Sequence, residues 1–412
     1  MPTHFRPEPP TLLCPISLIV DDSAPIYADR LSPEAVAQKR AAGEGVDWWT
    51  FCDDFLALCE RYGVHGKFTV LPYHAEYGMV DRLKSPVRRR QLREFVSVVQ
   101  ERILPRFDIT PEIISHGPVI DPATDLPLGV AEPEHEWSQT QSVETLTGYI
   151  ARALQALQSI GLPANGVTSP CDFGIRNEGN YVRAIHAAMK ATGGPALTWY
   201  FLHCERYDYH EPRLMLLDAE AGEAVVSVGG AGAVSDMGLT ARFGKDVAAI
   251  IDEHITADGQ GGVLPRMIES GSTIVMYNHW WSLMDEGRKT GLQVLAGVLP
   301  RLKKHYGTRV QWMRCSDIAR YYATARACRT CSVATEEGAK VLLQSPFSCP
   351  GFTFSFHADR AVKTVAVAEQ RLKRTTRSGR LGRGQWRQEG EKVFVCVDVD
   401  RETELQVVQS RG

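Results

Sequence analysis

Two adjacent carboxylates, Asp21 and Asp22, follow directly after the mostly apolar run Ile16–Val20. Such a run is typical of a buried parallel strand, so both carboxylates fall where that strand ends and the chain turns toward Pro25. Side by side at the end of a core strand they repel each other, and a metal ion or a shared proton relieves such repulsion. The same residues could instead only cap the next segment. The pattern leaves a functional pair and a structural turn open.

Further polar residues follow other strand-like segments. His116, His279 and the turn Ser169–Asp172 each come where an apolar run ends. In a parallel β/α fold, functional residues gather at the carboxyl ends of the strands. Carboxylates together with imidazoles suit Zn²⁺ or another divalent transition metal that keeps one position open for water. Two carboxylates and two histidines at one end of separate strands therefore favour a functional site over a capped turn.

The segments that must position these residues alternate between strand and helix from residue 16 to about 325. Strand-like runs are separated by amphipathic helices predicted at 47–62, 88–104, 144–160, 181–191, 245–256, 292–305 and 316–325. This order predicts an α/β fold with parallel β/α units, in a closed or nearly closed barrel over 16–328. From residue 333 to 412 short β-rich runs indicate a small antiparallel, sandwich-like domain. Residues 1–15 are expected to form an N-terminal extension.

The composition excludes some classes of protein. The 412 residues are 44% hydrophobic and carry a net charge of -3, which argues against a nucleic-acid partner. We see no secretory leader and no apolar run of the ~18 residues that a membrane helix needs, so we expect a cytoplasmic protein without a membrane partner. Ten scattered cysteines fit a reducing compartment, and Cys328–Cys331 is read as surface chemistry or chance.

Seven basic residues lie close together in the C-terminal part, and we read them as a solvated hairpin, with contact to an anionic glycan as the alternative. They are Arg371, Lys373, Arg374, Arg377, Arg380, Arg383 and Arg387. The sequence does not determine the oligomeric state, and a homo-oligomer is open.

The order of the motifs resembles that of the polysaccharide deacetylase superfamily, carbohydrate esterase family 4 and its relatives. Ile19–Pro25 is similar to the family motif T-F-D-D-G-P, which implies that Asp21 is the catalytic base and Asp22 a metal ligand. Glu112–His116 is similar to the second motif, which implies that His116 is the first metal histidine. Met276–His279 is similar to the last motif, which implies that His279 is the general acid. The resemblance covers about 16–325 and implies the distorted (β/α)7 barrel of the family.

This sequence departs from the family at the second metal histidine, where Ile120 stands four residues after His116. We expect His135 to replace it, because Glu134–Trp137 precedes a helix much as the family's second histidine does. Asp121 and Asp125 are the other possible replacements.

The arginine of the third motif is also absent, and Thr168 and Ser169 stand in that neighbourhood. The usual support for the base is therefore missing. Trp280 and Trp281 place two indoles beside His279, and such rings suit stacking on a sugar, with core packing as the alternative. As contacts to a substrate we predict residues of this turn and two tryptophans. They are Pro170, Asp172, Trp199 and Trp280.

These inferences predict a metal-dependent hydrolase, with a divalent ion such as Zn²⁺ held by Asp22, His116 and His135. The resemblance and the expected compartment favour a small-molecule or glycan substrate, most simply an N-acetylated sugar or a related small soluble amide. One alternative is a metal-free, glycan-binding pseudoenzyme. The other is a glycoside hydrolase on a related barrel, in which Asp21 or Asp22 works with a distant carboxylate.

Overall fold

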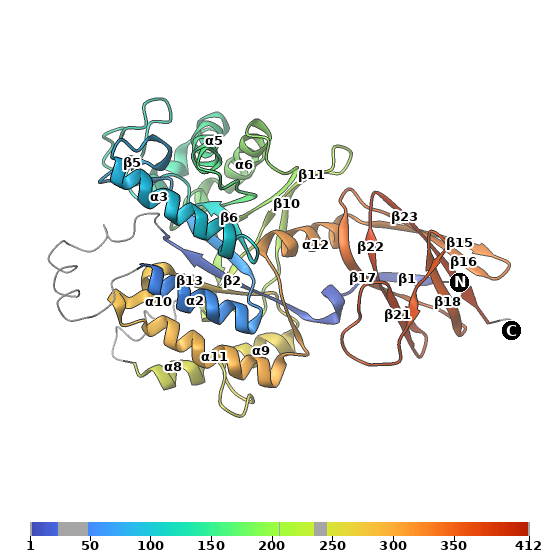
Figure 1. Ribbon diagram of the computed structural model, residues 1–412. Coiled ribbons are helices and arrows are strands. Elements are labelled where there is room, and N and C mark those ends of the chain that lie inside the picture. The colour runs from blue at the N-terminus through green and yellow to red at the C-terminus, as the bar shows by residue number, and fades with distance from the viewer. Residues whose placement is uncertain (1, 24–47, 206, 235–244, 411–412) are drawn as a thin grey trace.

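Parallel strands that alternate with helices build the larger part of the molecule (Figure 1). The computed structural model describes residues 2–23, 48–205, 207–234 and 245–410, so that Ala24, Pro25 and Asp47 lie outside the described residues. One sheet has the order β13-β2-β3-β6, and β14 also pairs with β2; all of these pairs are parallel. Its strands are β2 (Cys14–Asp21), β3 (Gly66–Val70), β6 (Phe107–Pro111), β13 (Ile274–His279) and β14 (Val310–Trp312).

A second sheet is formed by strands that follow β6 in the chain. It contains β7 (Gly166–Thr168), β8 (Leu197–Phe201) and β11 (Glu223–Ser227), which are parallel, and β10 (Arg213–Asp218), which pairs antiparallel with β11. A single parallel bridge from Glu112 to Thr168 connects the two sheets. The predicted alternation of strands and helices is thus confirmed. Among the described residues no ladder joins β11 to β13, and closure of the predicted barrel stays a prediction.

The helices lie where the apolar periodicity places them. All seven predicted helices are confirmed within three residues at each end, and α4, α9 and α10 are additional. The helices are α2 (Trp48–Tyr62), α3 (Pro86–Val98) with a π-helical continuation Val99–Ile103, α4 (Glu134–Trp137), α5 (Val143–Ser159), α6 (Glu178–Ala191), α8 (Val247–His254), α9 (Val263–Ser270), α10 (Trp280–Met284), α11 (Thr290–Tyr306) and α12 (Cys315–Ala327).

Local sequence explains several of these helix boundaries. The Ser142 side chain accepts a hydrogen bond from the Thr145 amide at the start of α5, and Asp246 caps α8 in the same way. The buried faces of the helices form two apolar clusters. One joins α2, α8, α9, α10 and α11 to β2, β3 and β6, and the other joins α5 and α6 to β8 and β11. The strand ends are therefore held between packed layers.

Short elements lie in the connections. They are β4 (Tyr73–His74), β5 (Gly78–Met79), β9 (Cys204–Glu205), β12 (Gly230–Ala231) and the 3-10 turns Pro10–Leu12, Val80–Arg82, Ser138–Thr140, Ile175–Asn177, Gly232–Val234 and Asp285–Gly287. No helix in the described ranges combines the length and the apolar character needed to cross a bilayer.

The C-terminal part contains two five-stranded sheets, drawn in orange and red in Figure 1 except for the blue strand β1 that one of them takes from the N-terminal segment. One has the order β1 (Thr3–Pro7), β17 (Cys349–His357), β22 (Lys392–Val399), β21 (Gln385–Glu389) and β20 (Lys373–Arg374). The other has the order β15 (Arg329–Thr335), β16 (Gly338–Gln344), β23 (Glu402–Gln409), β18 (Val362–Val367) and β19 (Gln370–Arg371).

Side chains of both sheets share one apolar cluster, among them Val341, Phe354, Val395 and Leu405, so the sheets pack face to face. Residues 1–15 are expected to form an N-terminal extension, and the described part of this stretch supplies strands to both parts of the molecule. Strand β1 pairs antiparallel with β17, and β2 begins at Cys14.

Candidate metal centre

Three side chains that can bind a metal converge beyond the carboxyl ends of β2 and β6. They are Asp22, Glu112 and His116, whose ligand atoms all lie within 4.8 Å of one another. His116 Nε2 lies 3.3 Å from Asp22 Oδ1 and 3.5 Å from Glu112 Oε1. The Asp22 amide also donates a hydrogen bond of 2.9 Å to Glu112 Oε2. Two carboxylates and an imidazole in this arrangement are a donor set that fits a divalent cation.

The backbone around the cluster adopts an uncommon conformation. Asp22, Ile113 and His116 have φ values of 61°, 44° and 53°, in the left-handed region that residues other than glycine rarely occupy. Such conformations persist where surrounding contacts fix them, and they are concentrated at functional sites. Here Glu134 supplies such contacts, because its carboxylate accepts hydrogen bonds from the amides of Ser115 and His116. The buried Glu134 carboxylate therefore fixes the strained turn after β6 through its hydrogen bonds to the backbone.

Charge is crowded in this cluster. Glu112 is 2% exposed, and burial, then the carboxylates of Asp22 and Asp21, raise its pKa well above the usual range. An opposite charge between these groups would remove the repulsion. The charge at the site and the types of its ligand atoms therefore both fit a cation.

Asp21 lies next to the cluster but has a different partner. The ammonium group of Lys67, from β3, contacts Asp21 Oδ1 and donates a 2.8 Å hydrogen bond to Thr168 Oγ1. Both side chains are buried, and burial raises the pKa of Asp21 while Lys67 opposes that shift. The pairing separates the two aspartates, because Asp21 faces a lysine and Asp22 faces His116 and Glu112.

His279 lies at the end of β13, whose register places it opposite Asp21. Its Nε2 lies 2.6 Å from the Tyr277 hydroxyl, and its ring stacks on Trp281 with centroids 5.1 Å apart. The indole of Trp281 in turn donates a 2.7 Å hydrogen bond to Asp22 Oδ2. The structure therefore brings His279 and the two aspartates together at the same edge, with Trp281 as the link.

His135 is not part of the three-residue cluster found among the described residues. It lies in α4, and its neighbour Glu134 is the residue that turns inward, because the Glu134 carboxylate also accepts a 2.9 Å hydrogen bond from the Tyr149 hydroxyl. Ile120 is buried and donates its amide hydrogen to the same hydroxyl. Glu112 thus occupies the place in the cluster for which His135 was the expected residue.

The two tryptophans expected at the substrate lie in the core instead. Trp280 is fully buried and packs edge-on against Phe55 and Phe68. Trp199 is fully buried too, and its indole donates a hydrogen bond of 3.2 Å to Asn165 Oδ1, before the start of β7. Neither ring is accessible, so both expected substrate contacts are corrected to packing residues.

The turn that follows β7 borders the cluster. Pro170 is buried and Asp172 is exposed, and Cys171 between them has a φ of 47°. Burial raises the pKa of the Cys171 thiol, and the carboxylates of Glu112 and Asp22 add to the shift. The turn therefore lies near the metal-binding candidates. Contact of Pro170 or Asp172 with a substrate remains a prediction.

Two residues of the site were assigned no role from the sequence. Glu112 is separated from His116 by three residues and directly follows a strand, and this E-x-x-x-H spacing was the available signal. Lys67 is a single charged residue in the otherwise apolar or small G-K-F-T-V run, and such a lysine needs a buried partner.

No family model matches the sequence, and no curated protein matches it either. Solved structures that the chain matches include that of a "putative polysaccharide deacetylase" from Mycobacterium smegmatis, with 14% identity over 77% of this chain and 93% of that one, and a TM-score of 0.46. They also include a CE4 family pseudoenzyme from Bacillus anthracis, with 6% identity over 74% and 66% of the chains and a TM-score of 0.33.

An α-fucosidase from Thermotoga maritima is 13% identical over 98% of this chain and 97% of its own, with a TM-score of 0.29. All three scores lie below 0.5, so these likenesses do not assign the chain to a family.

Proposed function

We propose that the protein is a metal-dependent hydrolase of a non-peptide C–N bond, with an N-acetylated sugar or a related small soluble amide as its substrate. The observation that carries this proposal is the convergence of Asp22, Glu112 and His116 beside the buried Asp21–Lys67 pair. A metal site and a separately held carboxylate are the two parts that hydrolysis of an amide by water requires.

Asp22, Glu112 and His116 would hold the ion, and we propose Zn²⁺ because carboxylate and imidazole ligands together suit it. A divalent ion bound there would lower the pKa of a water molecule and polarise the acyl oxygen of the substrate. Trp281, which donates to Asp22 Oδ2, fixes the orientation of that carboxylate.

Asp21 would act as the general base and accept a proton from the attacking water, while a C–O bond forms at the acyl carbon. Lys67 opposes the rise that burial causes in the pKa of Asp21 and orients its carboxylate, and Thr168 accepts a hydrogen bond from the same ammonium group. The family's arginine is absent, and this lysine from β3 supplies a positive charge beside the base. Such proton transfer typically contributes ~10²–10⁴-fold to the rate.

His279 would donate a proton to the nitrogen as the C–N bond breaks, so the products are a carboxylic acid and an amine. The Tyr277 hydroxyl, 2.6 Å from Nε2, holds the imidazole at the end of β13. The ring of Trp281, stacked on His279, covers its other face. His279 is therefore placed by two neighbours that do not themselves need to react.

The test is release of acetate from N-acetylglucosamine and its short oligomers by the purified chain, with D21N as the comparison. We expect turnover by the wild-type protein and a loss of ~10²–10⁴-fold in D21N. Equal rates for the two proteins would refute the role of Asp21, and no acetate release from any probe would refute this substrate class.

A second candidate function is a metal-free saccharide-binding protein. It is favoured by Ile120, which is buried where the family has a metal histidine, and by His135, which lies outside the three-residue cluster. Elemental analysis separates the two functions, because a binding protein would be purified with far less than one divalent ion per chain.

A further inference from the structure

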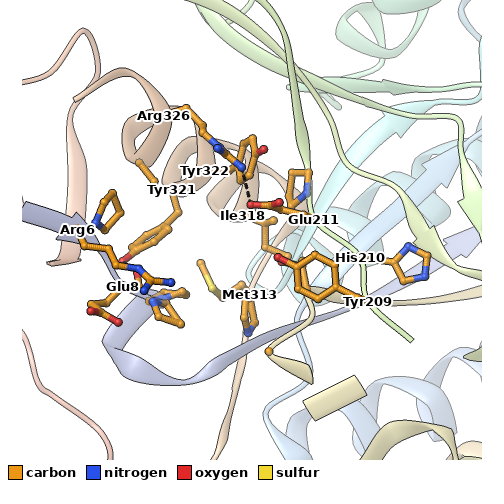
Figure 2. A pocket seen from close by; sticks show the side chains of 18 residues that line it. Arg6, Glu8, Tyr209, His210, Glu211, Met313, Ile318, Tyr321, Tyr322 and Arg326 are labelled. Atoms are coloured by element: carbon orange, nitrogen blue, oxygen red, sulfur yellow. Dashed lines mark hydrogen bonds and ion pairs between the residues drawn. The ribbon is translucent and has the colours of Figure 1, made fainter. Parts of the chain in front are cut away.

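A cavity lies at the opposite end of the strands from the metal-site residues, between the parallel-strand body and the C-terminal sheets (Figure 2). Its volume is about 430 Å³, within the ~300–1,000 Å³ range of small-molecule sites. Pro15, at the start of β2, and Thr273, just before β13, form part of its floor. Asp21 lies six residues further along β2, roughly 20 Å away at ~3.3 Å per residue. The cavity is therefore separate from the proposed catalytic site.

Tyrosine rings form much of its wall. Tyr209 is 52% exposed and lines the opening, whereas Tyr321 is fixed by hydrogen bonds from its hydroxyl to the carbonyls of Glu8 and Thr353. Tyr322 lies beside them with the guanidinium of Arg326 over its ring, 5.0 Å from the centroid. The exposed ring of Tyr209 and the partly exposed ring of Tyr322 present apolar faces on which the C–H face of a sugar can stack, and the buried ring of Tyr321 supports them.

Charged groups of both signs surround these rings. In Figure 2, Arg6 and Glu8 lie on one side of the cavity, and Tyr209 and the Arg326–Glu211 pair lie on the other. Arg326 Nη2 lies 2.7 Å from Glu211 Oε1. A phosphate or carboxylate ligand would meet two carboxylates here, whereas a hydroxyl group both donates and accepts and therefore suits alternating arginines and glutamates.

One lining side chain has unused hydrogen-bonding capacity. His210 is 8% exposed, its backbone is tied to Ser272 and Thr273, and it lines both this cavity and a smaller hollow of about 210 Å³ beside it. In the described part of the chain, His210 Nε2 has no hydrogen-bond partner. A buried polar atom of this kind is normally satisfied, and a water molecule in the smaller hollow would satisfy it without a contact to the larger cavity.

We propose that this cavity is a binding site for a neutral saccharide, distinct from the metal centre. The aromatic wall supplies stacking, and the arginines and glutamates supply donors and acceptors for hydroxyl groups. Because residues of β1, the 207–212 segment and α12 all line it, the site exists only where the two parts of the molecule meet.

The test measures equilibrium binding of N,N′-diacetylchitobiose and of cellobiose by calorimetry, using the full chain with D21N so that turnover does not interfere. Y209A removes an exposed ring of the wall, and Y207A is the matched control, since Tyr207 is 67% exposed in the same segment and is not a wall residue. We expect Y209A to weaken binding of at least one disaccharide about tenfold and Y207A to leave it unchanged. R326M is expected to weaken it as well.

Three results would overturn the proposal. They are the absence of binding of both disaccharides, equal effects of Y209A and Y207A, and loss of binding in D22A without any effect of Y209A. The last result would place the saccharide at the metal centre. Failure of the proposed hydrolysis is detected separately, because this experiment measures binding and not acetate release.

Discussion

Strand β6 has a buried carboxylate near each end, and the two have opposite surroundings. Asp108, near the start, accepts hydrogen bonds of 2.7 Å from Asn165 Nδ2, 2.7 Å from the Ser316 amide and 2.8 Å from the Ser316 hydroxyl. Glu112, just after the end, accepts one from the Asp22 amide and lies beside the Asp22 carboxylate and His116. Burial raises the pKa of both carboxyl groups.

The comparison shows that burial alone does not distinguish a structural carboxylate from a functional one. At Asp108 the chain supplies donors, including the amide at the start of α12, so the group is satisfied by the fold itself. At Glu112 the chain places further carboxylates nearby, and an added cation would balance them. The predictions below test this contrast, from the largest expected effect to the smallest.

The largest contrast is expected in activity. E112A should reduce hydrolysis of the N-acetyl probes to background, because it removes a ligand of the proposed metal site. D108A should retain the specific activity of the wild-type protein per folded molecule, because its carboxylate lies at the other end of the strand. Initial rates measured at equal concentrations of folded protein check this. Similar losses in both variants would show that the ends of β6 do not differ in function.

Lys67 allows a test of the buried ion pair with Asp21. K67M should lower the free energy of unfolding by ~3–5 kcal/mol, because it leaves the buried Asp21 carboxylate without its opposite charge. The double variant K67M/D21N should recover much of this loss, since no buried charge then remains unpaired. Urea unfolding measures both. A K67M protein as stable as the wild type would contradict the ion pair.

The two carboxylates of β6 should also differ in stability, with opposite signs. D108A should lower the free energy of unfolding by ~1–3 kcal/mol, because it leaves the donors of Asn165 and Ser316 unsatisfied. E112Q should raise the stability of chelator-treated protein, because it removes one of the crowded negative charges. Urea unfolding in the presence of chelator provides the comparison. Destabilisation of similar size in D108A and E112Q would contradict the difference between the two carboxylates.

The smallest effect is a pH dependence. The folded-state pKa of Asp108 is raised above 3.8, so the folded chain binds this proton more tightly than the unfolded chain. Its contribution to stability therefore falls as pH rises from about 3.8 through the raised value. D108N should show a flatter dependence of unfolding free energy on pH in this range than the wild type. Parallel curves for the two proteins would mean that the pKa of Asp108 is not raised.

The parts of the fold and site that depend on local sequence were predictable. Apolar periodicity identified the helices, and the position of Asp21, Asp22 and His116 at the ends of apolar runs placed them on one edge. Long-range strand pairing was not predictable. Strand β1 pairs with β17 through residues more than 300 positions apart, and no local pattern specifies that contact. Lys67 was likewise unassigned, because its role depends on Asp21 in another strand.

Two side-chain directions depend on where a short helix begins. Glu134 and not His135 turns inward from α4, and Trp281 and not Trp280 lies at the site. Successive residues of a helix point about 100° apart, so the exact start of α4 or α10 decides which neighbour faces the cluster. Helix starts are the least certain feature of a sequence pattern, whereas the existence of a helix is well defined by its periodicity.

The most direct test of the central claim is the divalent metal content of the purified full-length chain, measured by elemental analysis after dialysis. We predict about one ion per chain for the wild type and for D108A, and a loss of that ion in D22A, E112A and H116A. Wild-type protein that remains without a stoichiometric ion after incubation with Zn²⁺, or an ion that E112A and H116A retain, would contradict the assignment of this cluster as a metal centre.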